Sequence, residues 1–225
     1  MKKYQNCLHV GSFEQFSRKV YTTEQGLRSN RATALVFDKK GVLYVGTQKG
    51  LSRLEGDKFV HVDVGDEAHV NMLFCDDNNH VFVGAENRLI EFNGKRRVSE
   101  REFNADIVDM KIDGDGTTWL LTKTILYRKP AGGVPGGGSC MAVLNDNRVY
   151  VGTLGGGLHA LTGKRWHWSE LMADITGLVS DTVTCVEYDN AGNVWIGTDK
   201  GMCVYDDKSY WLNSGNTQGL PDANI

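Results

Sequence analysis

One short motif recurs five times along this chain of 225 residues. Its clearest copy, residues 188–202, contains the turn Asn190-Ala191-Gly192, the apolar run Val194-Trp195-Ile196 and a second turn, Asp199-Lys200-Gly201. Gly accepts a positive φ and Asn tolerates one, so both suit turns, whereas β-branched and aromatic residues favour strands. The motif therefore predicts short strands joined by tight turns.

The aromatic residues at the centre of the five copies show the period of the repeat. They lie 38, 37, 31 and 45 residues apart, at Tyr44, Phe82, Trp119, Tyr150 and Trp195. A period of roughly 40 residues with about four short strands per copy is typical of propeller blades. We predict an all-β fold, a β-propeller of about five four-stranded blades. The chain would form a single domain or fragment over 1–225, with partial strands at both ends and blades at approximately 31–66, 67–104, 105–138, 139–180 and 181–214.

Two outer strands depart from the repeat pattern. Residues 96–103 are dense in charge, which is how exposed sheet edges avoid pairing with other chains. Residues 129–139 hold two prolines and a run of glycines where the third blade needs its outer strand. Because Pro lacks a donor and Gly is entropically costly in a strand, we expect a three-stranded third blade with a flexible loop.

The two ends bear on whether the ring closes. Residues 13–21 resemble the outer strand of a preceding blade, and residues 215–225 resemble a connection to a following one. The fifth blade already has an outer strand at 210–212, so the N-terminal strand is surplus. This favours an open arc, or a fragment of a longer propeller, over a closed five-bladed ring. An open arc exposes strand edges and apolar blade faces, which predicts assembly or aggregation there.

Composition narrows the class of partner and the compartment. The net charge of −3 gives no electrostatic case for nucleic acid, and no apolar run is long enough to span a membrane. Met1-Lys2-Lys3 is not followed by an apolar run, so we identify no signal peptide. The five cysteines form no CxxC pair and four lie in strand-like runs, which predicts buried free thiols (Cys7, Cys75, Cys140, Cys185 and Cys203).

Motifs for catalysis or metal binding are not found in the sequence. There is no phosphate-binding loop, zinc-protease helix or nucleophile elbow. Asp113-Gly114-Asp115-Gly116 resembles the start of a calcium loop, but its sixth and twelfth positions are Thr118 and Thr124. We therefore interpret it as a turn and expect no metal, no cofactor and no catalytic residue. The enzyme alternative needs an acid pair across the central channel, drawn from Asp106, Asp109, Asp181 and Glu187.

If the protein binds a ligand, propeller geometry predicts the site at one mouth of the channel. Loops leading into inner strands share a face with the loops between second and third strands. A mixed set of charged and polar side chains on that face suits an oligosaccharide, another polar small ligand or an acidic peptide. The candidate residues are Arg28, Asn30, Arg31, Lys49, His69, Arg88, Asp106, Lys123, Asp181, Asp199 and Lys200.

A pair of tryptophans on one outer strand offers a second candidate surface. Trp166 and Trp168 face the same side of a strand. Trp166 occupies the position of the packing aromatic of other outer strands, so we expect it to pack within the blade. Trp168 is the better candidate for a surface contact with a partner.

The repeat resembles that of the two-component-regulator propellers, which form the sensor regions of hybrid two-component histidine kinases of Bacteroides type. The matching residues are Asp189, Gly192, Trp195-Ile196-Gly197-Thr198 and Gly201, with Gly26-Leu27 and Gly219-Leu220-Pro221 matching the connections. The resemblance covers roughly residues 20–225, with departures at Ala85 and Leu121. It implies extracytoplasmic sensing of oligosaccharides. The compartment is periplasmic if the chain is part of such a sensor and cytoplasmic if it is complete.

Three functions remain open on this sequence. The first is a non-catalytic sensor or ligand-binding module that takes a polar ligand. The second is a protein-interaction scaffold, including self-association through blade edges. The third is a carbohydrate-active enzyme with an acid pair at the channel mouth, near Asp106 and Asp181.

Overall fold

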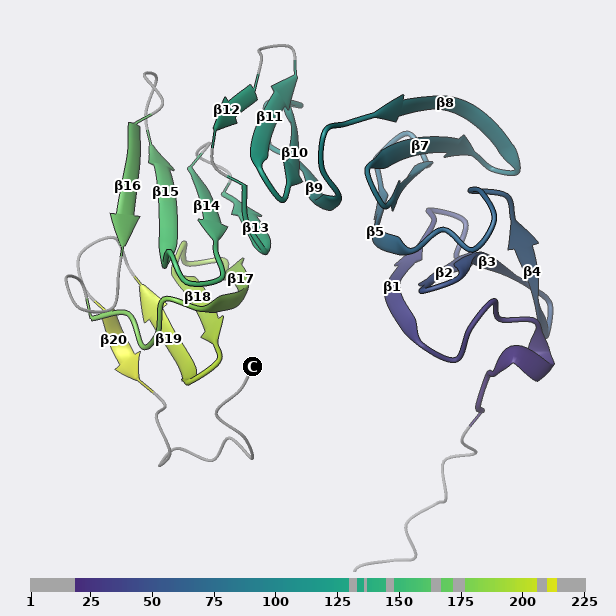
Figure 1. The fold of residues 1–225 in the computed structure, drawn as a ribbon, viewed down its shortest axis with the longest axis horizontal. Helices are drawn as coiled ribbons and strands as arrows, with labels where there is room; N and C mark the ends of the chain where they lie inside the picture. Colours follow the sequence, from purple (N-terminus) through teal and green to yellow (C-terminus); the bar gives the residue numbers. More distant parts are fainter. Residues whose placement is uncertain are drawn as a thin grey trace, which may run out of the picture.

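The chain forms a row of small antiparallel sheets (Figure 1). The computed structural model describes residues 19–129, 133–135, 137–144, 148–162, 167–171, 177–205 and 210–213. A short 3₁₀ helix, η1, comes first (Thr23–Gln25). The first sheet follows as β1 (Ala32–Phe37), β2 (Leu43–Thr47), β3 (Gly50–Glu55) and β4 (Lys58–Val62). The second comprises β5 (Val70–Cys75), β6 (His80–Ala85), β7 (Arg88–Asn93) and β8 (Arg96–Glu102).

The remaining three sheets repeat this order of strands. The third comprises β9 (Ile107–Ile112), β10 (Thr118–Thr122), β11 (Ile125–Lys129) and β12 (Gly133–Pro135). The fourth comprises β13 (Cys140–Val143), β14 (Val149–Gly152), β15 (Leu158–Thr162) and β16 (His167–Leu171). The fifth comprises β17 (Val183–Tyr188), β18 (Val194–Thr198), β19 (Gly201–Tyr205) and β20 (Tyr210–Asn213). In each sheet the four strands pair in sequence order, as in a propeller blade.

The five blades form an open arc. The first strands of successive blades, β1, β5, β9, β13 and β17, lie next to one another on the concave side. Blade 1 (β1–β4) and blade 5 (β17–β20) stand at opposite ends of the arc with a gap between them (Figure 1). No ring closure occurs in the part of the chain that the structure describes. The predicted all-β propeller of four-stranded blades is confirmed, and so is its open form.

Local side-chain bonds explain why the motif forms a hairpin. At the first turn of blades 1, 3 and 5 an aspartate accepts two backbone N–H groups, two and four residues further on. Asp113 does so from Asp115 at 3.0 Å and Thr117 at 2.8 Å, and the other two are Asp38 and Asp189. An acidic side chain bonded in this way fixes the turn. The segment from Asp113 is thus the structural turn that the sequence predicts.

Threonine fixes the second turn of the motif. Thr47 at the end of β2 donates from Oγ1 to the carbonyl of Gly50 at 2.9 Å and accepts from the N–H of Lys49 at 3.1 Å. Thr198 repeats both bonds in blade 5. Both side chains are fully buried, so these bonds satisfy groups that would otherwise be unpaired away from water.

The hydrophobic core lies between blades. Clusters of buried side chains join blade 1 to blade 2, blade 2 to blade 3, and so on along the arc. Tyr44, Trp119 and Tyr150 are each 1–2% exposed within these clusters. The strand β8, by contrast, is exposed at all seven residues, as its charged sequence predicts.

Several expectations from the sequence are wrong. Blade 3 has a fourth strand, because β12 pairs with β11 through Val134 opposite Leu126 despite the Pro and Gly around it. A three-residue outer strand needs few donors, so Pro135 is tolerated at its end. Lys19–Tyr21 form no strand, and residues 13–18 and 214–225 lie outside the described residues.

The cysteines are also less buried than expected. Cys203 is buried, Cys75 and Cys140 are half-buried, and Cys185 is exposed. Cys185 is on the inner strand β17 at the end of the arc, where no described element covers it. All four are free thiols, and Cys7 lies outside the described residues.

Candidate functional site

Four inner strands carry an irregularity near their first residue. The pairing register shifts at Thr33 in β1, Asn71 in β5, Val108 in β9 and Thr184 in β17. An extra residue in one strand re-aims its side chain and is frequent beside binding sites. These residues lie where each inner strand begins, on the concave side of the arc.

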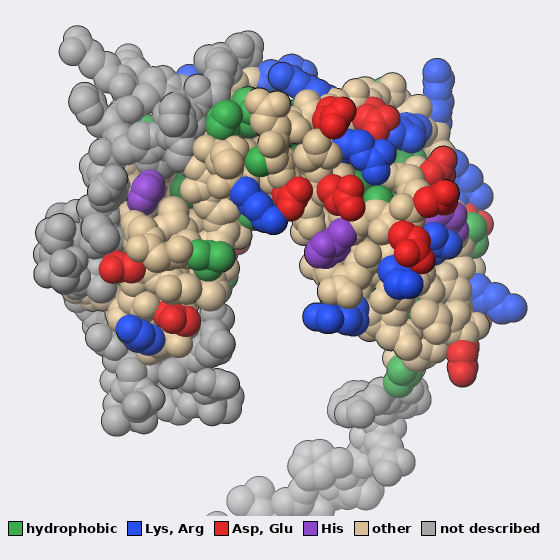
Figure 2. All heavy atoms as spheres, viewed as in Figure 1, with side chains coloured by type: hydrophobic (Ala, Val, Ile, Leu, Met, Phe, Trp, Pro, Cys, Tyr) green, Lys and Arg blue, Asp and Glu red, His purple; other side chains and the backbone are tan. Residues whose placement is uncertain are grey.

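A cavity of about 580 Å³ lies among these positions. Its walls come from the beginnings of the inner strands and from the turns between second and third strands. It therefore opens at the mouth of the hollow that the arc encloses, where charged side chains and a histidine line the rim (Figure 2). The lining residues are Thr33, His69, Asn71, Ile107, Val108, Lys123, Gly137, Gly138, Ser139, Thr153 and Leu154.

Some polar groups of this mouth cavity are already occupied. The Thr33 hydroxyl donates to the carbonyl of Val70 at 2.5 Å, and Ser139 donates to the carbonyl of Val183 at 2.6 Å. Each of these bonds links neighbouring blades. These hydroxyls therefore hold the inner strands together, and their donor protons are not available to a ligand.

Three other polar side chains of the cavity can contact a ligand. The ring of His69 has no hydrogen-bond partner among the described residues, and the Asn71 amide makes one long bond of 3.3 Å to the carbonyl of Glu86. Lys123 pairs with Asp106 at 2.6 Å, and both side chains are exposed. Leu154 is 72% exposed and adds an apolar surface. An apolar wall with a few polar groups is the usual composition of a ligand site.

Only some of the predicted site residues lie at the mouth cavity. His69 lines the cavity, and Asp106 is held at its edge by Lys123. Lys49 instead pairs with Glu67 at 3.3 Å. Arg28 donates from Nε to the carbonyl of Lys49 at 3.2 Å, so it supports a turn.

The other predicted residues on this face hold loops together. Asn30 accepts the N–H of Thr23 at 2.8 Å. The carbonyl of Arg31 accepts the N–H of Gln48, and that of Asp181 accepts the N–H groups of Gly155 and Gly157. Asp199 and Lys200 form the Thr198 turn described above. The side chain of Trp168, and all of Trp166, lie outside the described residues.

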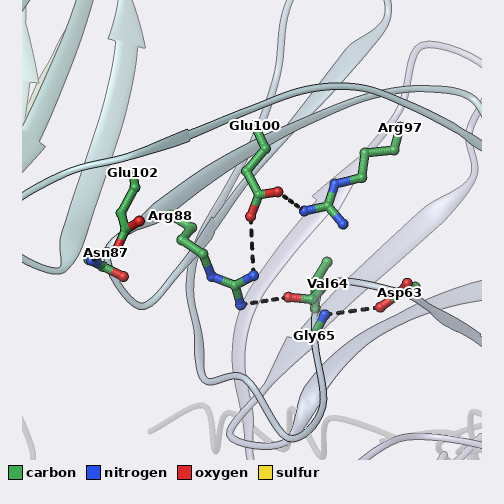
Figure 3. A network of polar contacts seen from close by, with 8 residues as sticks. All are labelled: Asp63, Val64, Gly65, Asn87, Arg88, Arg97, Glu100 and Glu102. Carbon is green, nitrogen blue, oxygen red and sulfur yellow. Dashed lines mark hydrogen bonds and ion pairs between the residues drawn. The ribbon is translucent and has the colours of Figure 1, made fainter.

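Arg88 occupies a structural network between two blades (Figure 3). One terminal nitrogen donates to the carbonyl of Val64 at 2.8 Å and the other bonds Glu100 at 3.2 Å. Arg97 also binds Glu100, which places a carboxylate between two guanidinium groups. The Arg88 side chain thus ties the connection after blade 1 to the outer strand of blade 2.

A second cluster lies on the inner strands within the hollow. The Nζ atom of Lys111, on β9, lies 4.0 Å from a carboxylate oxygen of Asp109 on the same strand. It also lies 3.9 Å from a carboxylate oxygen of Glu187 on β17, two blades further along the arc. Burial is the main cause that raises the pKa of Asp109 to about 6, and Glu187 adds to the rise, while Lys111 opposes it. Asp109 and Glu187 are two of the four carboxylates from which the sequence analysis drew a possible acid pair across the channel. Nothing in the sequence indicated that Lys111 would lie between them.

Metal and membrane sites are not found in the described residues. No three His, Cys, Asp or Glu side chains there gather closely enough to hold a metal ion. No helix of the described ranges is long and apolar enough to cross a lipid bilayer.

The fold and the mouth cavity define an open propeller with a ligand-sized hollow. Two segments, residues 26–49 and 177–200, match the family model for two component regulator propellers. These two segments therefore match repeats of the two-component-regulator propeller type, which the sequence resembles. Residues 26–49 cover the connection into blade 1 and its first hairpin, and residues 177–200 cover the same parts of blade 5. No curated protein matches the chain significantly.

Solved structures share the fold at low sequence identity. The extracellular domain described as that of a hybrid two-component system, BT3049 of B. thetaiotaomicron, matches with a TM-score of 0.74 and 18% identity over 90% of this chain and 30% of that chain. PorZ, a surface component of the Porphyromonas gingivalis type-IX secretion system, matches with a TM-score of 0.63 and 14% identity over 87% and 34%. Virginiamycin B lyase from Staphylococcus aureus matches with a TM-score of 0.64 and 12% sequence identity. The match covers 84% of this chain and 71% of the lyase chain. The chain spans about a third of the length of the first two.

Proposed function

We propose that this chain is a non-catalytic ligand-binding module of a sensor, and that it binds a polar ligand such as an oligosaccharide in the mouth cavity. The observation that carries the proposal is the cavity itself. It combines the His69 ring, the Asn71 amide and the Lys123–Asp106 pair with the exposed apolar side chain of Leu154. Sugars present both hydroxyl groups and apolar C–H faces, so this mixture suits them.

The proposal that the module belongs to a sensor is supported by the comparisons with known proteins. The repeats are of two-component-regulator type, and one fold neighbour is the extracellular domain of such a system. Another neighbour is a lyase, so the fold alone does not separate sensing from catalysis. Asp106 is bound to Lys123 and not to a second carboxylate, which favours binding over acid–base hydrolysis at the mouth.

A panel of defined oligosaccharides, assayed by isothermal calorimetry, tests the proposal. We expect at least one glycan to bind, and the double variant Asn71→Ala, Lys123→Met to lose at least tenfold in affinity. Lys49→Met is the matched control, because Lys49 lies on the same face outside the cavity and should keep full affinity. Binding that survives the double variant, or binding to no glycan, would contradict the mouth site. Cleavage of a bound glycan would support the enzyme alternative instead.

A protein-interaction scaffold is the second candidate function. Leu35 and Phe37 of blade 1 are 64% and 63% exposed on a strand, which is unusual for apolar side chains of this size. This observation belongs to the ends of the arc and is independent of the mouth cavity.

A further inference from the structure

The four internal blade–blade interfaces share one design. The aromatic residue of the second strand in each blade packs against apolar residues of the next blade. Tyr44 clusters with Val81 and Val83, and Trp119 with Met141 and Val149. Tyr150 clusters with Val186 and Val194 of blade 5 and contacts Tyr205 edge-on, with ring centroids 6.3 Å apart. Each blade therefore has an aromatic residue on the face toward the next blade. The next blade packs apolar side chains of its facing surface against that residue.

Blade 5 presents the same aromatic residue without a covering blade. Trp195 occupies the position of Trp119 and makes the same indole bond to a turn aspartate, at 3.0 Å from Asp189. Trp119 is 2% exposed, whereas Trp195 is 37% exposed. Because the local geometry is the same, the difference comes from the neighbour. Glu187, which pairs with Trp195 in the sheet, is exposed as well.

Blade 1 has the apolar face that elsewhere packs against the aromatic residue of the preceding blade, but no described blade precedes it. Leu35 occupies the position of Met110 in blade 3 and Val186 in blade 5, which are 2% and 6% exposed because a preceding blade covers them. Leu35 itself is 64% exposed. Leu43, on the paired strand, is half-buried, whereas its counterparts Val149 and Val194 are fully buried.

We propose that blade 5 of one copy packs against blade 1 of a second copy, head to tail, and so repeats the internal blade–blade interface. The occupant is a second copy because this chain carries both complementary halves. Its own two faces stand at opposite ends of the arc and do not meet (Figure 1). The contact joins different surfaces, so two copies can satisfy both contacts only if the arcs together close into a ring. Burial of Trp195 against Leu35 supplies the hydrophobic driving force.

Light scattering coupled to size exclusion gives the first test. We expect the mass to rise with concentration from one chain toward two. Leu35→Asp and Trp195→Asp should each cut the association at least tenfold, because each places a carboxylate in the contact. Val98→Asp is the matched control, since Val98 is 50% exposed on the outer strand β8, away from both faces. A mass of one chain at every concentration would overturn the proposal.

A mixing experiment then tests the head-to-tail geometry. The Leu35→Asp variant keeps an intact blade 5 face, and the Trp195→Asp variant keeps an intact blade 1 face. The two variants mixed should therefore form a pair with one intact contact, although neither associates alone. Recovery of the pair also shows that both variants are folded. If both variants are monomeric alone and mixing restores nothing, or if Leu35→Asp alone leaves the mass unchanged, the head-to-tail contact is wrong.

Discussion

The indole N–H of Trp119 donates a hydrogen bond of 2.9 Å to the Asp113 carboxylate. The other oxygen of that carboxylate holds the first turn of blade 3, so one side chain couples the turn to the aromatic residue at the blade interface. Asp189 and Trp195 repeat the arrangement in blade 5 at 3.0 Å. Two residues that are six positions apart in the repeat thus act as one unit.

Replacing Trp119 with Phe should destabilise the protein by at least about 1–2 kcal/mol, because a buried carboxylate oxygen loses its donor and the smaller phenyl ring fills less of the blade interface. Trp195→Phe is the control and should cost less, since its indole is 37% exposed and water can replace the lost bond. Urea unfolding of both variants measures the difference. Equal losses would show that the bond to Asp113 contributes little.

Gly26 should not tolerate a side chain. Its φ is +96°, and a Cβ built there would lie 2.1 Å from the carbonyl oxygen of Phe59. We expect Gly26→Ala to cost about 1–2 kcal/mol for the left-handed backbone and about 1–3 kcal/mol more for the clash. Gly41 has φ +78° and open space around it, so Gly41→Ala isolates the backbone cost. Thermal unfolding of the two variants should therefore differ clearly, and similar melting temperatures would argue against the contact with Phe59.

Arg88 should act on stability and leave ligand binding unchanged. Arg88→Met removes charged hydrogen bonds to Val64 and Glu100 and should cost about 1–2 kcal/mol in urea unfolding. Arg96→Met, at the exposed start of β8, should change stability by less than about 0.5 kcal/mol. A glycan affinity that falls in the Arg88 variant, with stability intact, would restore Arg88 to the candidate site.

Much of the fold could be predicted from sequence because its determinants are local. The predicted first blade, 31–66, contains β1 to β4, since the turn at Asp38 and the Thr47 turn are fixed by side chains within the repeat. The fourth strand of blade 3 was missed because its pairing with β11 depends on the neighbouring strand and not on its own Pro and Gly residues.

The sequence could predict which face of the propeller holds the candidate site, but not which side chains on that face are available to a ligand. Loop positions follow from the repeat, so the sequence predicted His69 and Lys123 on one face, and both line the mouth cavity. Which side chains are occupied depends on contacts between loops. Arg28 turns to the carbonyl of Lys49, and Arg88 turns to that of Val64, and neither contact has a sequence pattern. The position of Lys111 between Asp109 and Glu187 depends on the curvature of the arc, which the repeat does not specify.

Asp109 should make the free energy of unfolding depend on pH between about 4 and 7. Burial raises its folded pKa from 3.8 to about 6, with a further rise from Glu187 and opposition from Lys111 and the Met110 N–H. A carboxyl with a raised folded pKa stabilises the fold while protonated, and that contribution is lost as pH rises through about 6. The ionised group is then buried at a cost on the order of 3 kcal/mol. Asp109→Asn should therefore gain stability relative to the parent as pH goes from 4 to 7. Urea midpoints at each pH measure this difference, with Asp66→Asn, an exposed carboxylate, as the matched charge change. If the two Asn variants show the same pH trend, burial of Asp109 is not the cause.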